Sequence, residues 1–86
     1  MNGPRLVRVY KSRRKLDMYL YVDMAEGLAR VPETLLERFG APEPALTLRL
    51  TRERRLARAD AAEVLEALDR QGFYLQLPPP VGAVSR

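Results

Sequence analysis

The chain has 86 residues, which suffices for one domain with a thin core, because a chain of this length buries only about 60% of the surface that its unfolded form exposes. Hydrophobic residues make up 47% and charged residues 30% of the chain, a composition typical of a globular domain. The net charge of +4 favours acidic partners. The absence of Cys and His excludes disulfides and thiolate nucleophiles and removes the commonest general base and metal ligand.

We therefore expect a noncatalytic protein with no cofactor and no metal. No apolar run approaches the roughly 20 residues that a transmembrane helix requires, and residues 1–8 lack the apolar stretch of a signal peptide. These observations predict a cytoplasmic protein that does not contact a membrane.

Two strands are predicted near the start of the chain. Residues 6–10 alternate apolar Val7 and Val9 with Arg8 and Tyr10, as a half-buried strand does. Residues 18–22 alternate in the same way, with Tyr19 and Tyr21 on one parity. The polar residues 11–17 between them predict a basic hairpin loop.

A short helix should follow a turn at residues 24–30. Pro32 suits the first helical position, and Gly40 supplies a left-handed stop. Its apolar side would carry Leu35, Leu36 and Phe39. After the extended connector 41–44, an alternating strand is predicted at residues 46–51, followed by a basic turn at 52–58.

A second helix should run from Asp60 to about Gln71, with a reciprocal cap between Asp60 and Glu63 and a stop at Gly72. The acidic residues of this helix, including Glu66 and Asp69, fit caps and solvent-facing charges better than metal ligands. A final strand is expected at residues 73–77 and should end at Pro78 because proline cannot donate to a ladder.

The element order ββαβαβ predicts an α+β fold, a small two-layer sandwich of about four strands with both helices on one face of the sheet. Helices on both faces are the alternative arrangement. We expect one domain at residues 1–80 and a flexible C-terminal tail at 81–86.

Several segments of the chain resemble the YcgL domain family of small proteobacterial proteins over roughly residues 6–80. The segments are Val9-Tyr10-Lys11-Ser12, Met18-Tyr19-Leu20-Tyr21-Val22, Arg30-Val31-Pro32, Phe39-Gly40, Leu56-Ala57-Arg58-Ala59-Asp60 and Gln71-Gly72-Phe73-Tyr74-Leu75-Gln76-Leu77-Pro78-Pro79-Pro80. The last segment is the most specific in order and spacing.

The resemblance implies a compact bacterial α+β domain with no established activity and no catalytic residues to carry over. Gene neighbourhoods that contain ribonuclease D connect the family with RNA metabolism by association. The chain departs from the family pattern at Val7, where cysteine is frequent, and at Lys11, where arginine is frequent.

The leading functional hypothesis is a binding module that contacts single-stranded RNA or an RNA-processing protein. If the strands join in the expected register, one sheet face would collect Arg8, Tyr10, Tyr19, Tyr21, Arg49, Tyr74 and Gln76. Tyrosine rings could stack unpaired bases while arginines neutralise phosphates. A covered face of structural tyrosines is the competing interpretation.

Two basic clusters could contribute phosphate contacts. The first is the loop with Lys11, Arg13, Arg14 and Lys15, and the second comprises Arg52, Arg54, Arg55 and Arg58. Each is also typical of a solvated loop, and the hypothesis would gain if the two clusters were adjacent, which the sequence does not show.

The alternative function is a protein-protein adaptor or homodimer. It would act through an exposed sheet edge or through a polyproline segment at Pro78, Pro79 and Pro80.

Overall fold

The computed structural model describes residues 4–56 and 59–78 and contains one four-stranded antiparallel sheet. Its elements are β1 (Arg5–Ser12), β2 (Tyr19–Asp23), α1 (Glu33–Phe39), β3 (Pro42–Leu50), α2 (Ala61–Arg70) and β4 (Phe73–Gln76), and the strands lie in the order β3-β1-β2-β4. The predicted α+β class, the ββαβαβ order, the four strands and the two helices are confirmed. The predicted domain limit at residue 80 and the predicted tail lie outside the described residues.

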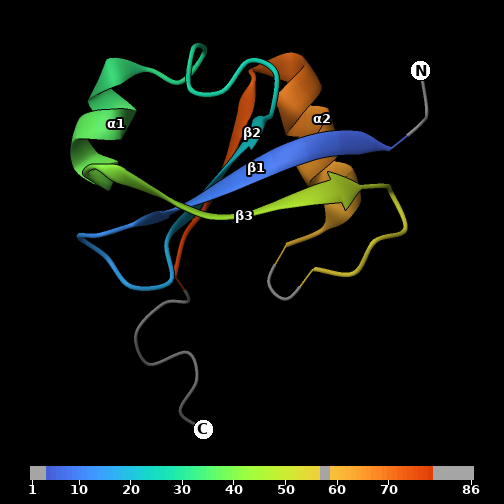
Figure 1. Ribbon diagram of the computed structural model, residues 1–86, viewed down its shortest axis with the longest axis horizontal. Coiled ribbons are helices and arrows are strands. Elements are labelled where there is room, and N and C mark those ends of the chain that lie inside the picture. The colour runs from blue at the N-terminus through green and yellow to red at the C-terminus, as the bar shows by residue number, and fades with distance from the viewer. Residues whose placement is uncertain (1–3, 57–58, 79–86) are drawn as a thin grey trace, which may run out of the picture.

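The two helices pack on opposite faces of the sheet, so the predicted placement of both on one face, and with it the two-layer arrangement, is wrong. The buried cluster on the α2 side comprises Val7, Val9, Tyr21, Leu50, Ala61, Val64 and Leu68. The buried cluster on the α1 side comprises Met18, Leu20, Val22, Val31 and Phe39. Successive strand residues point to opposite faces, and Tyr21 belongs to one cluster while Leu20 and Val22 belong to the other. In Figure 1, β2 and β4 accordingly pass between α1 and α2.

The register of the β1–β2 hairpin decides which side chains share a face. Val9 lies opposite Tyr21, and Tyr10 lies opposite Leu20. The Ser12 N–H donates to the Met18 carbonyl at 3.0 Å, which closes the hairpin around residues 13–17. A hairpin loop with an odd number of residues pairs odd-numbered positions with odd-numbered ones and even with even. The Tyr21 side chain therefore lies on the same face as the aliphatic side chains of Val7 and Val9. The predicted separation of tyrosines from aliphatic residues is wrong.

The helix ends differ from the sequence predictions in detail. α1 ends at Gly40, whose φ of 84° and ψ of −174° favour glycine. A Cβ atom at Gly40 would lie 2.8 Å from Cγ of Arg14, so the stem of this loop residue packs directly across the glycine. Asp60 occupies the predicted N-cap position of α2, but its side chain makes no cap hydrogen bond, and the helix ends at Arg70. The predicted reciprocal cap with Glu63 is therefore absent.

Within the described part of the chain, no helix is long and apolar enough to cross a membrane.

Candidate functional site

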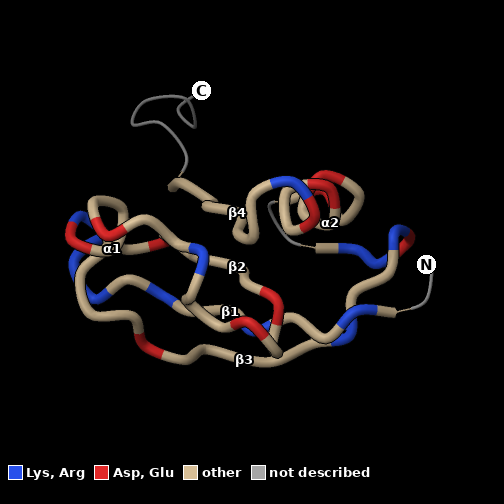
Figure 2. Tube along the Cα trace, turned by 90° about the horizontal axis from the view of Figure 1, so that it is seen from above, with Lys and Arg blue, Asp and Glu red and all other residues tan. Residues whose placement is uncertain are grey.

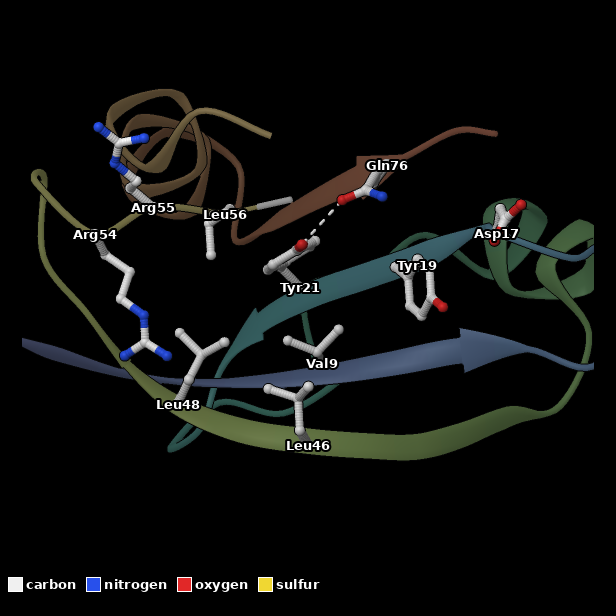
Figure 3. Close-up of a pocket in the computed structure, with 10 residues that line it drawn as sticks. All are labelled: Val9, Asp17, Tyr19, Tyr21, Leu46, Leu48, Arg54, Arg55, Leu56 and Gln76. Carbon is white, nitrogen blue, oxygen red and sulfur yellow. Dashed lines mark hydrogen bonds between the residues drawn. The ribbon is translucent and has the colours of Figure 1, made fainter. Parts of the chain in front are cut away.

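A groove of about 470 Å³ lies on the α2 side of the sheet, over the part of that face that residues of α2 do not line. Its lining residues are Val9, Asp17, Tyr19, Tyr21, Leu46, Leu48, Arg54, Arg55, Leu56 and Gln76. They come from all four strands, the hairpin loop and the turn after β3, and none belongs to α2 (Figure 3). The volume falls in the range of roughly 300 to 1,000 Å³ that is usual for ligand sites.

The floor of the groove is aliphatic. Val9 pairs with Leu46 across β1 and β3 and with Tyr21 across β1 and β2, which puts the three side chains on one face. Leu46 keeps 51% of its surface exposed, although it lies beside buried Val9. A large apolar side chain left half-exposed in a concavity offers surface to an apolar group of a partner.

A buried hydrogen bond fixes one wall of the groove. The Tyr21 hydroxyl donates to Oε1 of Gln76 at 2.9 Å, and the two residues are only 7% and 8% exposed. Burial, together with neighbouring Tyr74 and Tyr19, raises the pKa of the Tyr21 hydroxyl above its ordinary value. The Tyr21 ring meets Tyr74 edge to face, with centroids 5.8 Å apart. Tyr21 is therefore part of the wall and cannot stack a base.

The end of the groove next to β3 carries a positive charge. Nη1 of Arg54 donates to the carbonyl oxygen of Arg49 at 3.2 Å. Figure 3 shows the Arg54 guanidinium beside Leu48 at this end, whereas the Arg55 guanidinium points away from the groove. Asp17 lies at the other end. From the sequence, Arg54 is predicted only as part of a basic cluster, and the groove is not predicted. The signal for the groove is the surplus of apolar surface from three leucines of one parity in residues 46–50.

The two predicted basic clusters are not adjacent. β1 and β3 run antiparallel with Ser12 opposite Pro42 and Arg5 opposite Leu50, so the hairpin loop and the turn after β3 lie at opposite ends of these strands. At roughly 3.3 Å per strand residue, the separation is about 20 Å. Figures 1 and 2 show the hairpin and the turn at opposite ends of the molecule. The two clusters therefore do not form one phosphate patch within the described residues, and Arg58 lies outside them.

The basic loop is tethered at its base and partly neutralised. Buried Ser12 donates its hydroxyl to the Phe39 carbonyl at 2.6 Å and accepts the N–H groups of Arg14 and Lys15, each at 3.0 Å. Nζ of Lys11 lies 3.9 Å from Oε1 of Glu43. Arg14 shares a shallow surface hollow with Glu33 and Glu37 of α1. In Figure 2, acidic and basic stretches of the trace lie side by side near α1. Arg13, Arg14 and Lys15 are exposed.

The predicted Tyr/Arg face is divided between the two sides of the sheet. On the α2 side lie Tyr19, Tyr21, Tyr74 and Gln76. On the α1 side lie Arg8, Tyr10 and Arg49. Of the seven residues predicted for the Tyr/Arg face, the groove brings together Tyr19, Tyr21 and Gln76. Pro78 is half-buried, and Pro79 and Pro80 lie outside the described residues.

The outward groups of the edge strand β3 are blocked in part. The Met24 N–H donates to the Leu6 carbonyl and the Ser12 N–H to the Met18 carbonyl, so even-numbered residues of β1 bond to β2 and odd-numbered ones to β3. On β3, the backbone groups of Leu46 and Leu48, which pair with Val9 and Val7, bond to β1. The backbone N–H and C=O groups of Thr47 and Arg49 point away from β1, toward solvent. Arg54 covers the outward Arg49 carbonyl.

Three further positions on the two edges are also protected. Pro42 and Pro44 pair with even-numbered residues of β1 and have no N–H to present outward. On β4 the same alternation turns Phe73 outward, and Nε2 of Gln71 donates to its carbonyl at 2.9 Å. These features protect part of each edge and leave the outward backbone groups of Thr47 and Leu75 for a partner strand.

The geometry defines a small α+β domain with one apolar groove that ends in an arginine. Among the residues described, no three acidic side chains gather in a group that could hold a metal ion.

Comparison with known proteins gives the family. The sequence profile of the YcgL domain matches residues 7–79. A YcgL domain-containing protein of Pseudomonas aeruginosa is 60% identical over 75 residues, which cover 87% of this chain and 77% of the relative. Relatives of the same name from Chromohalobacter salexigens and Hahella chejuensis are 57% and 52% identical over 87% of this chain, with 78% and 71% of their own lengths covered. The chain belongs to the YcgL domain family, as its sequence motifs predict.

Proposed function

We propose that this protein is a noncatalytic binding module whose groove accepts an apolar segment of a partner protein. The carrying observation is the aliphatic floor, in which Leu46 remains 51% exposed inside a concavity of about 470 Å³. Burial of apolar surface contributes about 25 cal/mol per Å², so one inserted aliphatic side chain suffices for a weak, specific anchor.

A protein segment fits the groove better than an RNA base. Base stacking requires open aromatic faces, yet Tyr21 is buried and bonded to Gln76, which leaves Tyr19 as the half-buried tyrosine of the groove. The remaining lining is mostly aliphatic. Among the described residues, Asp17 is the only carboxylate that lines the groove, so that part of the chain supplies no paired acid and base of a hydrolase there. These features support binding without catalysis.

Selection from a displayed peptide library tests the proposal. Peptides should be enriched on the wild-type protein, and Leu46→Asp should abolish their binding because it places an unpaired charge in the apolar floor. Thr47→Asp is the matched control, since Thr47 is exposed on the same strand but its side chain belongs to the opposite face. Peptides that bind Leu46→Asp as well as wild type would contradict the groove as the site.

Single-stranded RNA is the second candidate partner, and the exposed Arg13 and Lys15 at the hairpin tip favour it. Under this second hypothesis, the protein acts in the cytoplasm and its hairpin loop contacts the phosphates of the RNA, whereas the sheet does not contact the bases. Counterion release makes such binding fall steeply with salt. Amide shifts at residues 13–15 on addition of a mixed RNA oligonucleotide, lost at physiological salt, would support it, whereas no shifts at low salt would exclude it.

A further inference from the structure

We propose that the groove recognises a carboxylate beside an apolar side chain, with Arg54 binding the carboxylate. This inference rests on the proposed function, because it names the chemistry of the segment that the groove accepts. The partner is thus an extended protein segment in which an acidic group follows or precedes an aliphatic residue.

Arg54 is held in place without its charge being neutralised. Its Nη1 donates to the Arg49 carbonyl at 3.2 Å, which fixes the guanidinium at the end of the groove. A neutral carbonyl satisfies one of the five donors of a guanidinium and leaves the positive charge uncompensated. In the described ranges 4–56 and 59–78, no carboxylate lies within ion-pair distance of Arg54, whereas Arg5 has two such partners and Lys11 and Arg30 have one each.

The apolar floor begins directly beside this cation. In Figure 3, the Arg54 guanidinium lies next to Leu48, and Leu46 follows along the same strand. Both leucines pair with inward-facing residues of β1 and line the groove. An aliphatic side chain that packs on Leu46 and Leu48 therefore places a neighbouring carboxylate within reach of Arg54.

The groove is also preformed along its length, with Asp17 at the end away from Arg54. The wall between the two ends is made rigid by the buried bond from Tyr21 to Gln76. A preformed wall lowers the ordering cost of binding, which matters for a ligand with few anchors.

An arginine suits this role better than a lysine would. The planar guanidinium can give two parallel N–H···O bonds to one carboxylate, and such charge-assisted pairs are roughly twice as strong as neutral hydrogen bonds. Because one donor is already bound to the Arg49 carbonyl, less rotamer entropy is lost when the ligand binds.

Two small probes that differ only in charge test the inference. N-acetyl-leucine carries an aliphatic side chain and a carboxylate, and N-acetyl-leucinamide has the same body without the charge. Each is titrated into the wild-type protein while the methyl signals of Leu46 and Leu48 are followed by NMR. We expect N-acetyl-leucine to shift these methyl signals and to bind about tenfold more tightly than the amide, which corresponds to one charged hydrogen bond.

Substitutions of Arg54 test whether this residue causes the preference for the carboxylate. Arg54→Gln should remove the preference for the carboxylate, and Arg54→Lys should lose most of it because the planar fork is gone. Arg38→Gln, an exposed arginine of α1 far from the groove, is the charge-matched control and should keep the full preference. The backbone amide signals of Arg49 and Thr51 show whether the turn keeps its structure in each variant.

The outcomes separate this inference from the proposed function. Equal binding of both probes at the groove would overturn carboxylate recognition and leave the groove as an apolar site. A preference that persists in Arg54→Gln would also overturn it, because another group would then bind the carboxylate. If neither probe shifts the groove methyl signals and no library peptide binds, the proposed function itself fails.

Discussion

The Tyr21 hydroxyl donates a 2.9 Å hydrogen bond to Oε1 of Gln76 and thereby joins β2 to β4 inside the α2 side of the sheet. Tyr21→Phe would leave a buried amide oxygen without its donor. We expect the free energy of unfolding to fall by about 1 to 2 kcal/mol, because an unsatisfied buried acceptor costs its full desolvation energy. Urea denaturation followed by circular dichroism measures this loss.

Tyr10→Phe is the control for that substitution. Tyr10 is half-buried on the α1 side and makes no side-chain hydrogen bond with a described residue, so its loss should change stability little. The double variant Tyr21→Phe with Gln76→Leu should recover part of the stability, since both polar partners are then gone. Equal costs for Tyr21→Phe and Tyr10→Phe would show that the bond contributes nothing.

Local patterns predicted the elements well and the assembly of the sheet poorly. Proline and glycine marked both ends of α1, and the order of strands and helices followed from the alternating and helical periods. These signals depend on residues close together in sequence. The side of the sheet that each helix covers depends on long-range packing, and β2 is apolar on both parities because Tyr21 is buried like Leu20.

The failure of the Tyr/Arg face has a specific cause in the hairpin register. A loop at residues 11–17 contains an odd number of residues, as does the observed loop at residues 13–17, so either loop pairs positions of like parity. That rule alone places Val9 on the same face as Tyr21, and a one-residue change in register would have reversed every side chain. The groove, in contrast, required the fold, because the turn that supplies Arg54 meets the sheet only in three dimensions.

An ion pair between Arg5 and Asp23 should make stability depend on pH. Nε of Arg5 donates to Oδ1 of Asp23 at 3.0 Å, and this bond is the main cause that lowers the pKa of the Asp23 carboxyl. The stabilisation is fully present above the unfolded pKa of about 3.9 and is lost as the pH falls through the lower folded pKa. Asp23→Asn should cost about 1 to 3 kcal/mol at neutral pH, and its difference from wild type should shrink below about pH 4.

Asp69→Asn provides the comparison, because Asp69 binds the same arginine but its side chain is 76% exposed. Solvent screening should keep its effect below about 1 kcal/mol at every pH. Urea midpoints between neutral and acidic pH measure both variants. A difference between Asp23→Asn and wild type that stays constant across the acid range would contradict linkage to this carboxyl.

Ser12 should control the shape of the basic loop. Its buried hydroxyl donates to the Phe39 carbonyl and accepts two backbone N–H groups, from Arg14 and Lys15. Ser12→Ala removes all three bonds, and we expect a loss of about 1 to 3 kcal/mol together with faster amide exchange at Arg14 and Lys15. Thr34→Ala, at an exposed site on α1, should change neither quantity. Unchanged exchange in Ser12→Ala would show that the loop holds its conformation without the tether.

The edge of β3 should become a self-association site when its protection is removed. Pro44→Thr restores an outward N–H, and Arg54→Ala frees the outward carbonyl of Arg49. An edge strand with unpaired donors and acceptors pairs readily with another copy, so the double variant should show a higher weight-average mass than wild type in sedimentation velocity. Pro44→Thr with Arg55→Ala removes the same charge but leaves the Arg49 carbonyl covered, and it should sediment like wild type. If the two double variants associate equally, the guanidinium of Arg54 does not protect the edge, and the prolines and the local bulge between Val9 and Tyr10 suffice.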